Sequence, residues 1–384
     1  MRWSSGGTTG MVPVRESAPL RTPTGGLSRS GDLVEARALP MSGPPQLELF
    51  APSPGVAAEP RPPEPPAPAP VSVELRELGA RLAHDLRLGT SSWSFPGWTG
   101  LVYAREASAG VLAREGLPAY ARHPLLRTVG VDRTFYGPVS TETFQAWAEA
   151  VPEDFRFLVK AHEALTLARF PHQDRYGARR GEENPGFLDP AYALDHGLDH
   201  PVAGLGPKAG PLVFQFPPQD VQVVGGAQGF ADRLHAFLAA LPPGPLYAVE
   251  LRNRELYTSD VADVLEDVGA VPVLTVWRHL PPLPEQARRL RARAASALVV
   301  RWMLPPDLDH AQAQELYAPF DRLVNEDPRT RGDIGQLAAE ALLDRRPVYV
   351  TVNNKAEGSA PVSIERLAAA LVSRLSPPGS DDRR

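Results

Sequence analysis

The sequence predicts an α/β protein with the fold of a TIM-type (β/α)8 barrel, and three observations support this prediction. Eight short apolar runs recur along residues 86–354, and each carries polar or charged residues near its C-terminal end. The runs are rich in Val, Leu and Phe, which is typical of strands buried on both faces, and the segments between them have helical spacing. Eight strand–helix repeats favour a closed parallel barrel over an open doubly wound sheet, which is the alternative.

The predicted strands follow one another along the chain at residues 86–93, 128–136, 155–162, 211–217, 247–253, 272–277, 297–304 and 347–354. A long polar connection, 167–208, separates the third from the fourth. Within it, Asp189 and Pro190 predict the cap and the first turn of a helix. A connection of this length indicates a lid or a substrate-binding insertion, and a surface elaboration is the alternative.

Both ends of the chain predict disorder. Residues 1–80 combine Gly, Ser, Thr and Arg with a run of prolines at 60–70, and they lack the apolar density that offsets chain entropy. We therefore expect a disordered, Pro-rich N-terminal tail over 1–80 and the barrel over 81–376. Two prolines and a glycine end the last helix, so a second disordered tail is expected at 377–384.

Composition excludes several classes of site. The chain has no cysteine, which excludes disulfides, thiolate-bound zinc and a cysteine nucleophile. No segment is apolar over the roughly 20 residues that a membrane span needs, and no secretion signal is evident, so we expect a cytoplasmic protein without membrane contact. The net charge of −5 provides no global basic field, so nucleic-acid binding would depend on a local patch.

The predicted tail contains one apolar cluster, which consists of Gln46, Leu47, Glu48, Leu49 and Phe50. This segment resembles the Gln-Leu-x-Leu-Phe pentapeptide with which bacterial DNA polymerases and repair proteins dock into the sliding clamp. Gln46 would supply a polar contact, and the three apolar side chains would fill pockets from an extended backbone. A coincidental cluster of apolar residues is the alternative.

Period-two alternation places polar side chains of several strands on one face, near one rim of the barrel. Glu250 and Arg252 share a face of the fifth run, and Lys160 and His162 share a face of the third. Burying many ionisable groups is unfavourable unless they pair or meet a ligand, so the rim is a candidate functional site. A salt-bridge network that fills the upper barrel layer is the alternative.

The residue types at the rim favour an anionic ligand, because cations and amides outnumber acids. The candidate substrate-binding residues are Lys160, Arg252, Gln215, Arg301, Asn353, Asn354, Thr90, Trp93 and Tyr136. Candidate catalytic groups are Glu250 or Asp132 as a general base and His162 as a proton shuttle, with Lys160 beside them. No cofactor is predicted, and a divalent metal bound by Asp132, His162 and Glu250 has no signature spacing to support it.

Aromatic residues flank the loop after the first run. Trp93 and Trp98 enclose a turn at Pro96 and Gly97. Two interpretations stay open: the indoles stack on a base or a sugar, or they plug the top of the barrel against the region of Tyr103.

Six segments carry a family resemblance that spans essentially the whole predicted barrel, at residues 89–98, 134–136, 155–161, 210–218, 250–252 and 352–354. Together and in this order they resemble the signatures of the YecE-like family, the domain of unknown function 72. The resemblance implies a TIM-type barrel, similar in fold to apurinic endonuclease IV and to sugar isomerases, and it implies no settled activity.

The rim both matches and departs from the family pattern. The positions that match are Lys160, Gln215, Glu250, Arg252, Arg301 and Asn354, and those that depart are Gly130, Asp132, His162, Leu256, Met303 and Leu304. Few His residues lie near strand ends, so the three-zinc chemistry of endonuclease IV is not expected.

Three functions are compatible with these observations. The first is a hydrolase that acts on a phosphate-bearing substrate, a nucleotide or nucleic acid, in DNA maintenance. The second is a non-catalytic protein that binds an anionic molecule or nucleic acid and is tethered to the sliding clamp. The third is a carbohydrate-active or sugar-phosphate isomerase-like enzyme, which the indoles favour.

Overall fold

The structure is a computed structural model, and it describes residues 64–376 except for the side chains of residues 196 and 197. The predicted tail up to residue 63, the pentapeptide at 46–50 and the predicted C-terminal tail at 377–384 lie outside the described residues. No helix of the described part has the length and apolar character that crossing a membrane requires.

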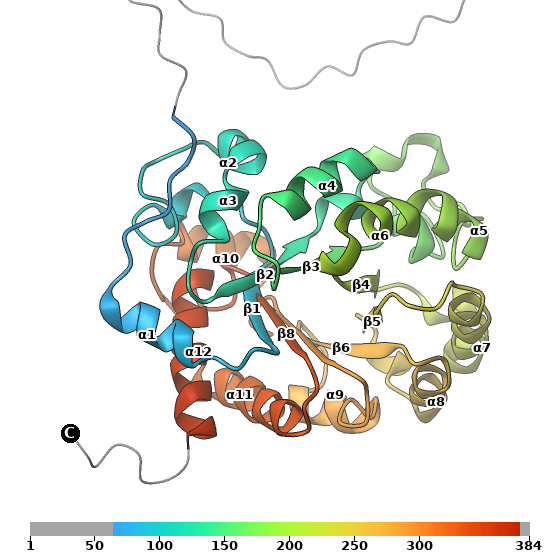
Figure 1. Cartoon of the computed structure of the whole chain (residues 1–384). Coiled ribbons are helices and arrows are strands. Elements are labelled where there is room, and N and C mark those ends of the chain that lie inside the picture. The colour runs from blue at the N-terminus through green and yellow to red at the C-terminus, as the bar shows by residue number, and fades with distance from the viewer. Residues whose placement is uncertain (1–63, 377–384) are drawn as a thin grey trace, which may run out of the picture. The chain divides into compact units, whose positions relative to one another are not determined.

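Eight parallel strands close into a barrel in chain order, and the first strand pairs with the last. They are β1 (Leu86–Thr90), β2 (Leu126–Val131), β3 (Arg156–Lys160), β4 (Ala209–Phe216), β5 (Tyr247–Leu251), β6 (Val271–Val276), β7 (Leu298–Trp302) and β8 (Val348–Val352). Every predicted run overlaps one of these strands, and β2, β4 and β6 begin one or two residues before the predicted starts. The TIM-type barrel is therefore confirmed, and the open sheet is excluded (Figure 1).

Helices surround the barrel (Figure 1). They are α1 (Val73–Arg81), α2 (Ala109–Glu115), α3 (Leu117–Tyr120), α4 (Thr141–Glu149), α5 (Pro190–Ala193), α6 (Asp199–Leu205), α7 (Gly226–Ala239), α8 (Ser259–Val268), α9 (Leu283–Arg289), α10 (His310–Tyr317), α11 (Pro328–Leu343) and α12 (Ala360–Leu375). Short 3-10 turns connect several of them to the strands, among them Arg133–Phe135 after β2 and Glu163–Leu165 after β3.

The core has two layers, as period-two alternation requires. Outward-facing residues such as Leu86 and Leu88 pack between the strands and the helices. Inward-facing residues fill the barrel interior, and these are Leu158, Val213, Ala248, Val271, Val273, Ala297, Val299 and Tyr349. The apolar interior layer lies below the strand ends, so the next inward positions along the strands face the C-terminal mouth.

Described structure begins before the predicted boundary between residues 80 and 81. Ser72 caps α1, because its side chain accepts a hydrogen bond from the Leu75 amide, and Gly79 lets the helix approach Pro124 closely. Further upstream, the Ala69 amide donates to the carbonyl of Val102. Helix α1 therefore belongs to the barrel unit, which it covers on the side of α12.

One glycine is required where β1 and β2 meet. A Cβ atom at Gly89 would lie 1.8 Å from the Thr128 carbonyl oxygen, and the pairing register shifts between Leu88 and Gly89. Any side chain at this position would push the two strands apart.

The long connection after β3 is an ordered insertion. Asp189 accepts a hydrogen bond from the Ala191 amide, and Pro190 begins α5, as the sequence predicts. Asn184 fastens the preceding loop, because its side-chain amide donates to the carbonyls of Ala164 and Leu167, both at 2.7 Å.

Candidate functional site

A buried carboxylate is at the centre of the mouth. Glu250 faces inward from β5 and has no solvent exposure. One of its oxygens accepts from Nε of Arg252 at 2.6 Å, and the other accepts from Nη1 of Arg301 at 2.7 Å. The carboxylate thus fixes the position of two guanidinium groups.

Arg301 connects this carboxylate to a second one. Its Nη2 donates to both carboxylate oxygens of Asp132, at 3.0 and 3.1 Å. The side chain of Arg301 is 1% exposed, whereas that of Asp132 is 33% exposed. Asp132 therefore lies nearer to solvent, on the outer side of the network.

Lys160 ends β3 and completes the group. Its Nζ lies 3.5 Å from the centroid of the Phe135 ring, and none of the ion pairs among the described residues involves it. Burial lowers the pKa of Lys160 to about 8, although the nearby carboxylate of Asp132 favours the charged form. Lys160 therefore loses its proton at a lower pH than an ordinary lysine.

We call Asp132, Lys160, Glu250, Arg252 and Arg301 the central cluster. Burial alone would raise the pKa of Glu250, but the charges of Arg252 and Arg301 lower it to about 2, so this carboxylate stays ionised. Three cations then face two carboxylates, and the cluster has one positive charge in excess. The predicted convergence of these five residues is thus observed, and part of the cluster is the salt-bridge network of the alternative interpretation.

The rim continues beyond Arg252 with residues that the sequence analysis did not select. The Arg252 guanidinium carbon lies 4.0 Å from the centroid of the Trp277 ring, and this ring lies 5.7 Å from that of His310. Trp277 is in period-two alternation with Thr275, so its inward orientation was predictable. His310 begins α10 after β7, and the loop that positions this helix has no sequence period to predict it.

His162 does not join the central cluster. Its Nδ1 accepts from the Ala164 amide at 3.2 Å and from the Tyr192 hydroxyl at 3.0 Å. It lines a pocket of about 470 Å³ that the insertion forms, together with Asn184 and Asp189. Among the described residues, no group of three or more His, Asp or Glu could bind a metal ion, so the combination with Asp132 and Glu250 is not assembled.

Three other predicted site residues face away from the mouth. Thr90 shares the outward face of Leu86 and Leu88, and its hydroxyl lies 2.9 Å from that of Tyr120. Trp93 is buried, and its Nε1 donates to the Leu112 carbonyl at 3.1 Å. Both residues therefore support the packing of the helices, and Thr90 does not face the mouth, where it was expected.

Asn354 is also a packing residue. Its side-chain oxygen accepts from Nε1 of Trp98 at 3.0 Å and from the Ala360 amide at 2.9 Å. Trp98 is buried as well, so neither indole of the first loop is open to a base or a sugar. Strand β8 ends at Val352, and the turn that follows it directs this side chain outward.

The last three predicted binding residues are at or near the mouth. Gln215 is buried on β4 in register with Glu250. The side chain of Asn353 accepts from the Lys355 amide at 3.0 Å. Tyr136 follows the turn Arg133–Phe135, after β2 has ended, and it is 65% exposed. The guanidinium of Arg175 lies over its ring at 5.2 Å.

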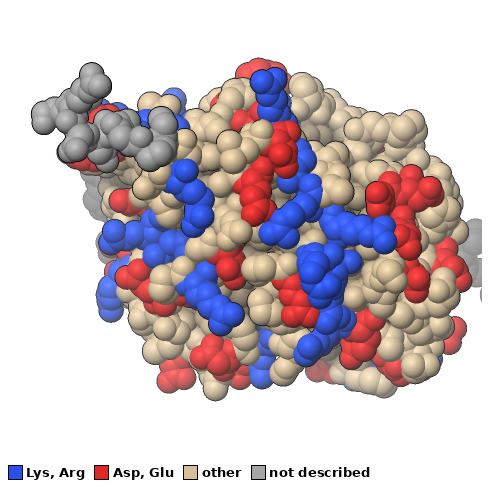
Figure 2. Space-filling view, turned by 90° about the horizontal axis from the view of Figure 1, so that it is seen from below, with Lys and Arg blue, Asp and Glu red and all other residues tan. Residues whose placement is uncertain are grey.

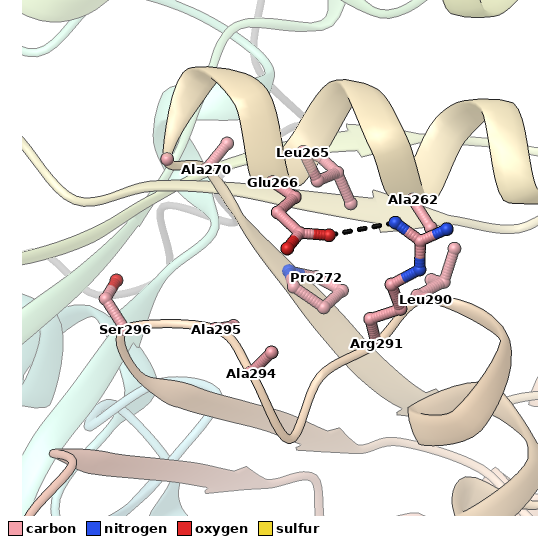
Figure 3. Close-up of a pocket in the computed structure, with 11 residues that line it drawn as sticks. Ala262, Leu265, Glu266, Ala270, Pro272, Leu290, Arg291, Ala294, Ala295 and Ser296 are labelled. Atoms are coloured by element: carbon pink, nitrogen blue, oxygen red, sulfur yellow. Dashed lines mark hydrogen bonds and ion pairs between the residues drawn. The ribbon is translucent and has the colours of Figure 1, made fainter.

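Other surfaces carry weaker signals of function. A pocket of about 230 Å³ lies beside α8, near the starts of β6 and β7 and thus at the opposite end of the strands, and mostly apolar side chains line it (Figure 3). On the face seen from below, Lys and Arg alternate with Asp and Glu (Figure 2). On the side of α8, α9 and α11, Arg291 pairs with Glu266 and Arg293 with Glu340, each at 2.8 Å. These charges largely neutralise one another.

Comparisons with known proteins identify the family. The family model described as a protein of unknown function, DUF72, matches residues 87–382. The structure of a DUF72 family protein from Thermotoga maritima aligns with a TM-score of 0.51 at 18% identity, and the alignment covers 74% of this chain and 98% of that chain. A DUF72 family protein from Enterococcus faecalis aligns with a TM-score of 0.48 at 18% identity, over 78% of this chain and 99% of that chain. No curated protein matches. Because the family model spans most of the barrel and more than half of the chain, the chain belongs to the DUF72 family, the YecE-like family that the sequence motifs indicated.

Proposed function

We propose that the mouth of the barrel binds a ligand through a phosphate group, with Lys160 and Arg252 as the principal contacts. The observation that carries this proposal is the charge of the central cluster, in which three buried cations face two carboxylates. A phosphate group would supply the missing negative charge. The site lies at the C-terminal ends of the strands, where barrels of this type bind their ligands.

The carboxylates of the cluster have a positioning role in this proposal. Glu250 holds Arg252 through Nε, and Nη1 of Arg252 makes no hydrogen bond to any described residue. This nitrogen and Nζ of Lys160 are the donors available to an anion. A rigidly held guanidinium loses little side-chain entropy when a ligand binds, which favours affinity.

Binding of inorganic sulfate, a phosphate surrogate with constant charge, tests the proposal by titration calorimetry. Lys160→Gln is expected to weaken sulfate binding by about tenfold or more. The matched control is Lys208→Gln, which changes the largely buried lysine before β4 whose ammonium donates to the carbonyls of Ala148 and Val151. Equal sulfate affinity in the wild type and Lys160→Gln would contradict the proposal.

Hydrolysis of a phosphate ester at this site is a second candidate function. Its specific support is Lys160, whose pKa of about 8 suits a general acid at neutral pH. Asp132 is the better candidate for the base, because its side chain is 33% exposed, whereas Glu250 is fully buried between two arginines. A panel of nucleotides, sugar phosphates and oligonucleotides, assayed for phosphate release with Asp132→Asn as control, tests this function. Equal phosphate release by the wild type and by Asp132→Asn would refute the role of Asp132 as the base.

The carbohydrate hypothesis loses its main support, because Trp93 and Trp98 are both buried in the packing between strands and helices. A sugar would have to be recognised through its phosphate instead. Sugar phosphates therefore stay in the panel of ligands, whereas neutral sugars serve there as negative controls.

We also propose that residues 46–50 dock into the bacterial sliding clamp. The support is the sequence alone, Gln-Leu-Glu-Leu-Phe between prolines. The full-length chain should be captured by immobilised clamp, and replacement of both Leu49 and Phe50 by Ala should abolish capture. Undiminished capture of the double variant would exclude this mode of docking.

A further inference from the structure

Two basic side chains, His310 and Lys355, lie next to the central cluster, across the indole of Trp277. This ring contacts Arg252 on one side, with 4.0 Å between the guanidinium carbon and the ring centroid, and His310 on another, with 5.7 Å between ring centroids. A single side chain thus separates His310 from the anion-binding guanidinium of the proposed function. His310 is the first residue of α10, and it lies in the region that follows β7 at the C-terminal end of the barrel.

Lys355 lies in the turn that follows β8, its Nζ is near Phe320, which packs in the same cluster as Trp277, and its charge acts on His310. Its backbone is fixed, because its amide donates to the side chain of Asn353 at 3.0 Å, and its Nζ lies 5.7 Å from the centroid of the Phe320 ring. None of the ion pairs among the described residues involves Lys355. Burial lowers its pKa, as expected for an ammonium group that is half-buried without a carboxylate partner.

The acid closest in sequence does not neutralise this pair. Asp309 caps α10, and one of its carboxylate oxygens accepts from the Gln312 amide at 2.8 Å. Burial lowers the pKa of His310, and the positive charges of Lys355 and Arg252 lower it further, more than Asp309 compensates. The positive charge near His310 therefore comes from Lys355 and Arg252.

We propose that Lys355 and His310 form a second anion subsite. The ligand of the barrel mouth then carries two phosphate groups, one on each side of Trp277. This inference rests on the proposed function, because the first phosphate is the one held by Lys160 and Arg252. Two chemical sources fit: a small molecule with two phosphate groups, and two consecutive phosphates of a single-stranded nucleic acid. In both cases the exposed part of the Trp277 ring would contact the sugar or base between the phosphates.

Three probes separate the subsites and the sources: inorganic sulfate with one anionic group, a hexose bisphosphate, and a single-stranded DNA pentanucleotide. The full-length chain is compared with Lys355→Gln by titration calorimetry. We expect Lys355→Gln to leave sulfate affinity unchanged and to weaken binding of the bisphosphate or the pentanucleotide by about tenfold. Lys355→Arg keeps the charge and should retain most of that affinity.

Several outcomes decide the proposal. If Lys160→Gln abolishes sulfate binding but Lys355→Gln binds the two-phosphate probes like the wild type, the second subsite is refuted and the proposed function stands. If Lys160→Gln binds sulfate normally, the proposed function itself fails. Preference for the bisphosphate or for the pentanucleotide identifies the source, and failure of the wild type to prefer either over sulfate overturns the second subsite.

Discussion

At the scale of single residues, Glu250 is the side chain of the mouth whose charge matters most for stability. Both of its oxygens are engaged by guanidinium groups, and it has no contact with solvent. Glu250→Gln would keep the shape but remove the charge that compensates Arg252 and Arg301. We expect a loss of about 3–5 kcal/mol in the free energy of unfolding, measured by urea denaturation, because two buried cations lose their common partner.

Glu340→Gln is the matched control for this prediction. Glu340 also pairs with an arginine, Arg293, at 2.8 Å, but its side chain is 35% exposed. Removing such an exposed pair should change the free energy of unfolding by no more than about 1 kcal/mol. A similar decrease in the free energy of unfolding of Glu250→Gln and Glu340→Gln would show that burial does not determine the effect at Glu250.

Lys160 predicts a pH dependence of anion binding. Its pKa in the folded protein is about 8, below its ordinary value, and Asp132, Glu250, Arg252 and Arg301 are the charged groups that act on it. An anion binds the protonated form, so sulfate affinity should be constant below pH 7 and fall as the pH rises through about 8. Calorimetry from pH 6 to 9.5 measures this, and Lys160→Arg should abolish the decline because arginine stays charged.

The same residue predicts a conflict between stability and binding. Folding lowers the pKa of Lys160, so the unfolded chain binds the proton of this lysine more tightly than the folded chain. Burial of the charged ammonium therefore lowers the free energy of unfolding, fully so below pH 8. This loss of stability diminishes as the pH rises from 8 toward the ordinary pKa of lysine. Lys160→Met should therefore raise the melting temperature at pH 7 while it removes sulfate binding. A lower melting temperature together with intact binding would contradict both expectations.

The sequence was informative about the site where strand periodicity applies. Glu250 and Arg252 were predicted on one face of β5, and they meet there because alternation holds up to the strand end. Thr90 was assigned to the mouth from its position alone, although its alternation with Leu88 points outward. His310 and Lys355 could not be predicted, since their positions depend on how two loops fold over the rim.

At the scale of elements, Gly89 sets the distance between β1 and β2. Gly89→Ala should lower the free energy of unfolding by several kcal/mol, because the new Cβ would lie 1.8 Å from the backbone oxygen of Thr128 and the paired strands would have to separate. Gly137→Ala is the control, since no atom lies within 4 Å of a Cβ at that position. Thermal denaturation of the two variants measures the difference, and equal melting temperatures would refute the packing argument.

In the insertion after β3, Asn184 should stabilise the local structure rather than the whole barrel. This side chain is bonded to three backbone groups, donating to Ala164 and Leu167 and accepting from the Gly186 amide at 3.0 Å. Asn184→Ala should leave the melting temperature of the barrel nearly unchanged but accelerate proteolytic cleavage within residues 163–189. Glu183→Ala, at an exposed neighbouring position, should be cleaved like the wild type. Slow cleavage of both variants would mean that other contacts hold the insertion.

The elements differ in how well the sequence predicts them. All eight strands were recognisable, because most of their residues are buried and several of them, such as β6 and β7, are nearly continuous in apolar residues. Helix α1 was missed since it is short, mostly exposed and preceded by prolines. Its cap, Ser72, was the local signal that could have identified it.

At the scale of the whole molecule, the central cluster connects distant parts of the chain. Asp132 follows β2, Glu250 lies on β5 and Arg301 on β7, so that three separate strands share one network. A ligand held by this network should stabilise the barrel globally, by about 2.7 kcal/mol at a concentration of 100 times its Kd. Hydrogen exchange with and without sulfate should show protection in all three strands, whereas protection confined to β3 would contradict a shared network.

Closure of the ring has a consequence for synthesis of the chain. Strand β1 pairs along its whole length with β8, from Leu86 with Val348 to Thr90 with Val352. One flank of β1 therefore has no partner until translation has passed residue 352, and every shorter nascent chain presents an open strand edge to its surroundings. Ribosome-bound intermediates that stop before β8 should accordingly be the species most in need of a chaperone, although the finished barrel offers no edge at all.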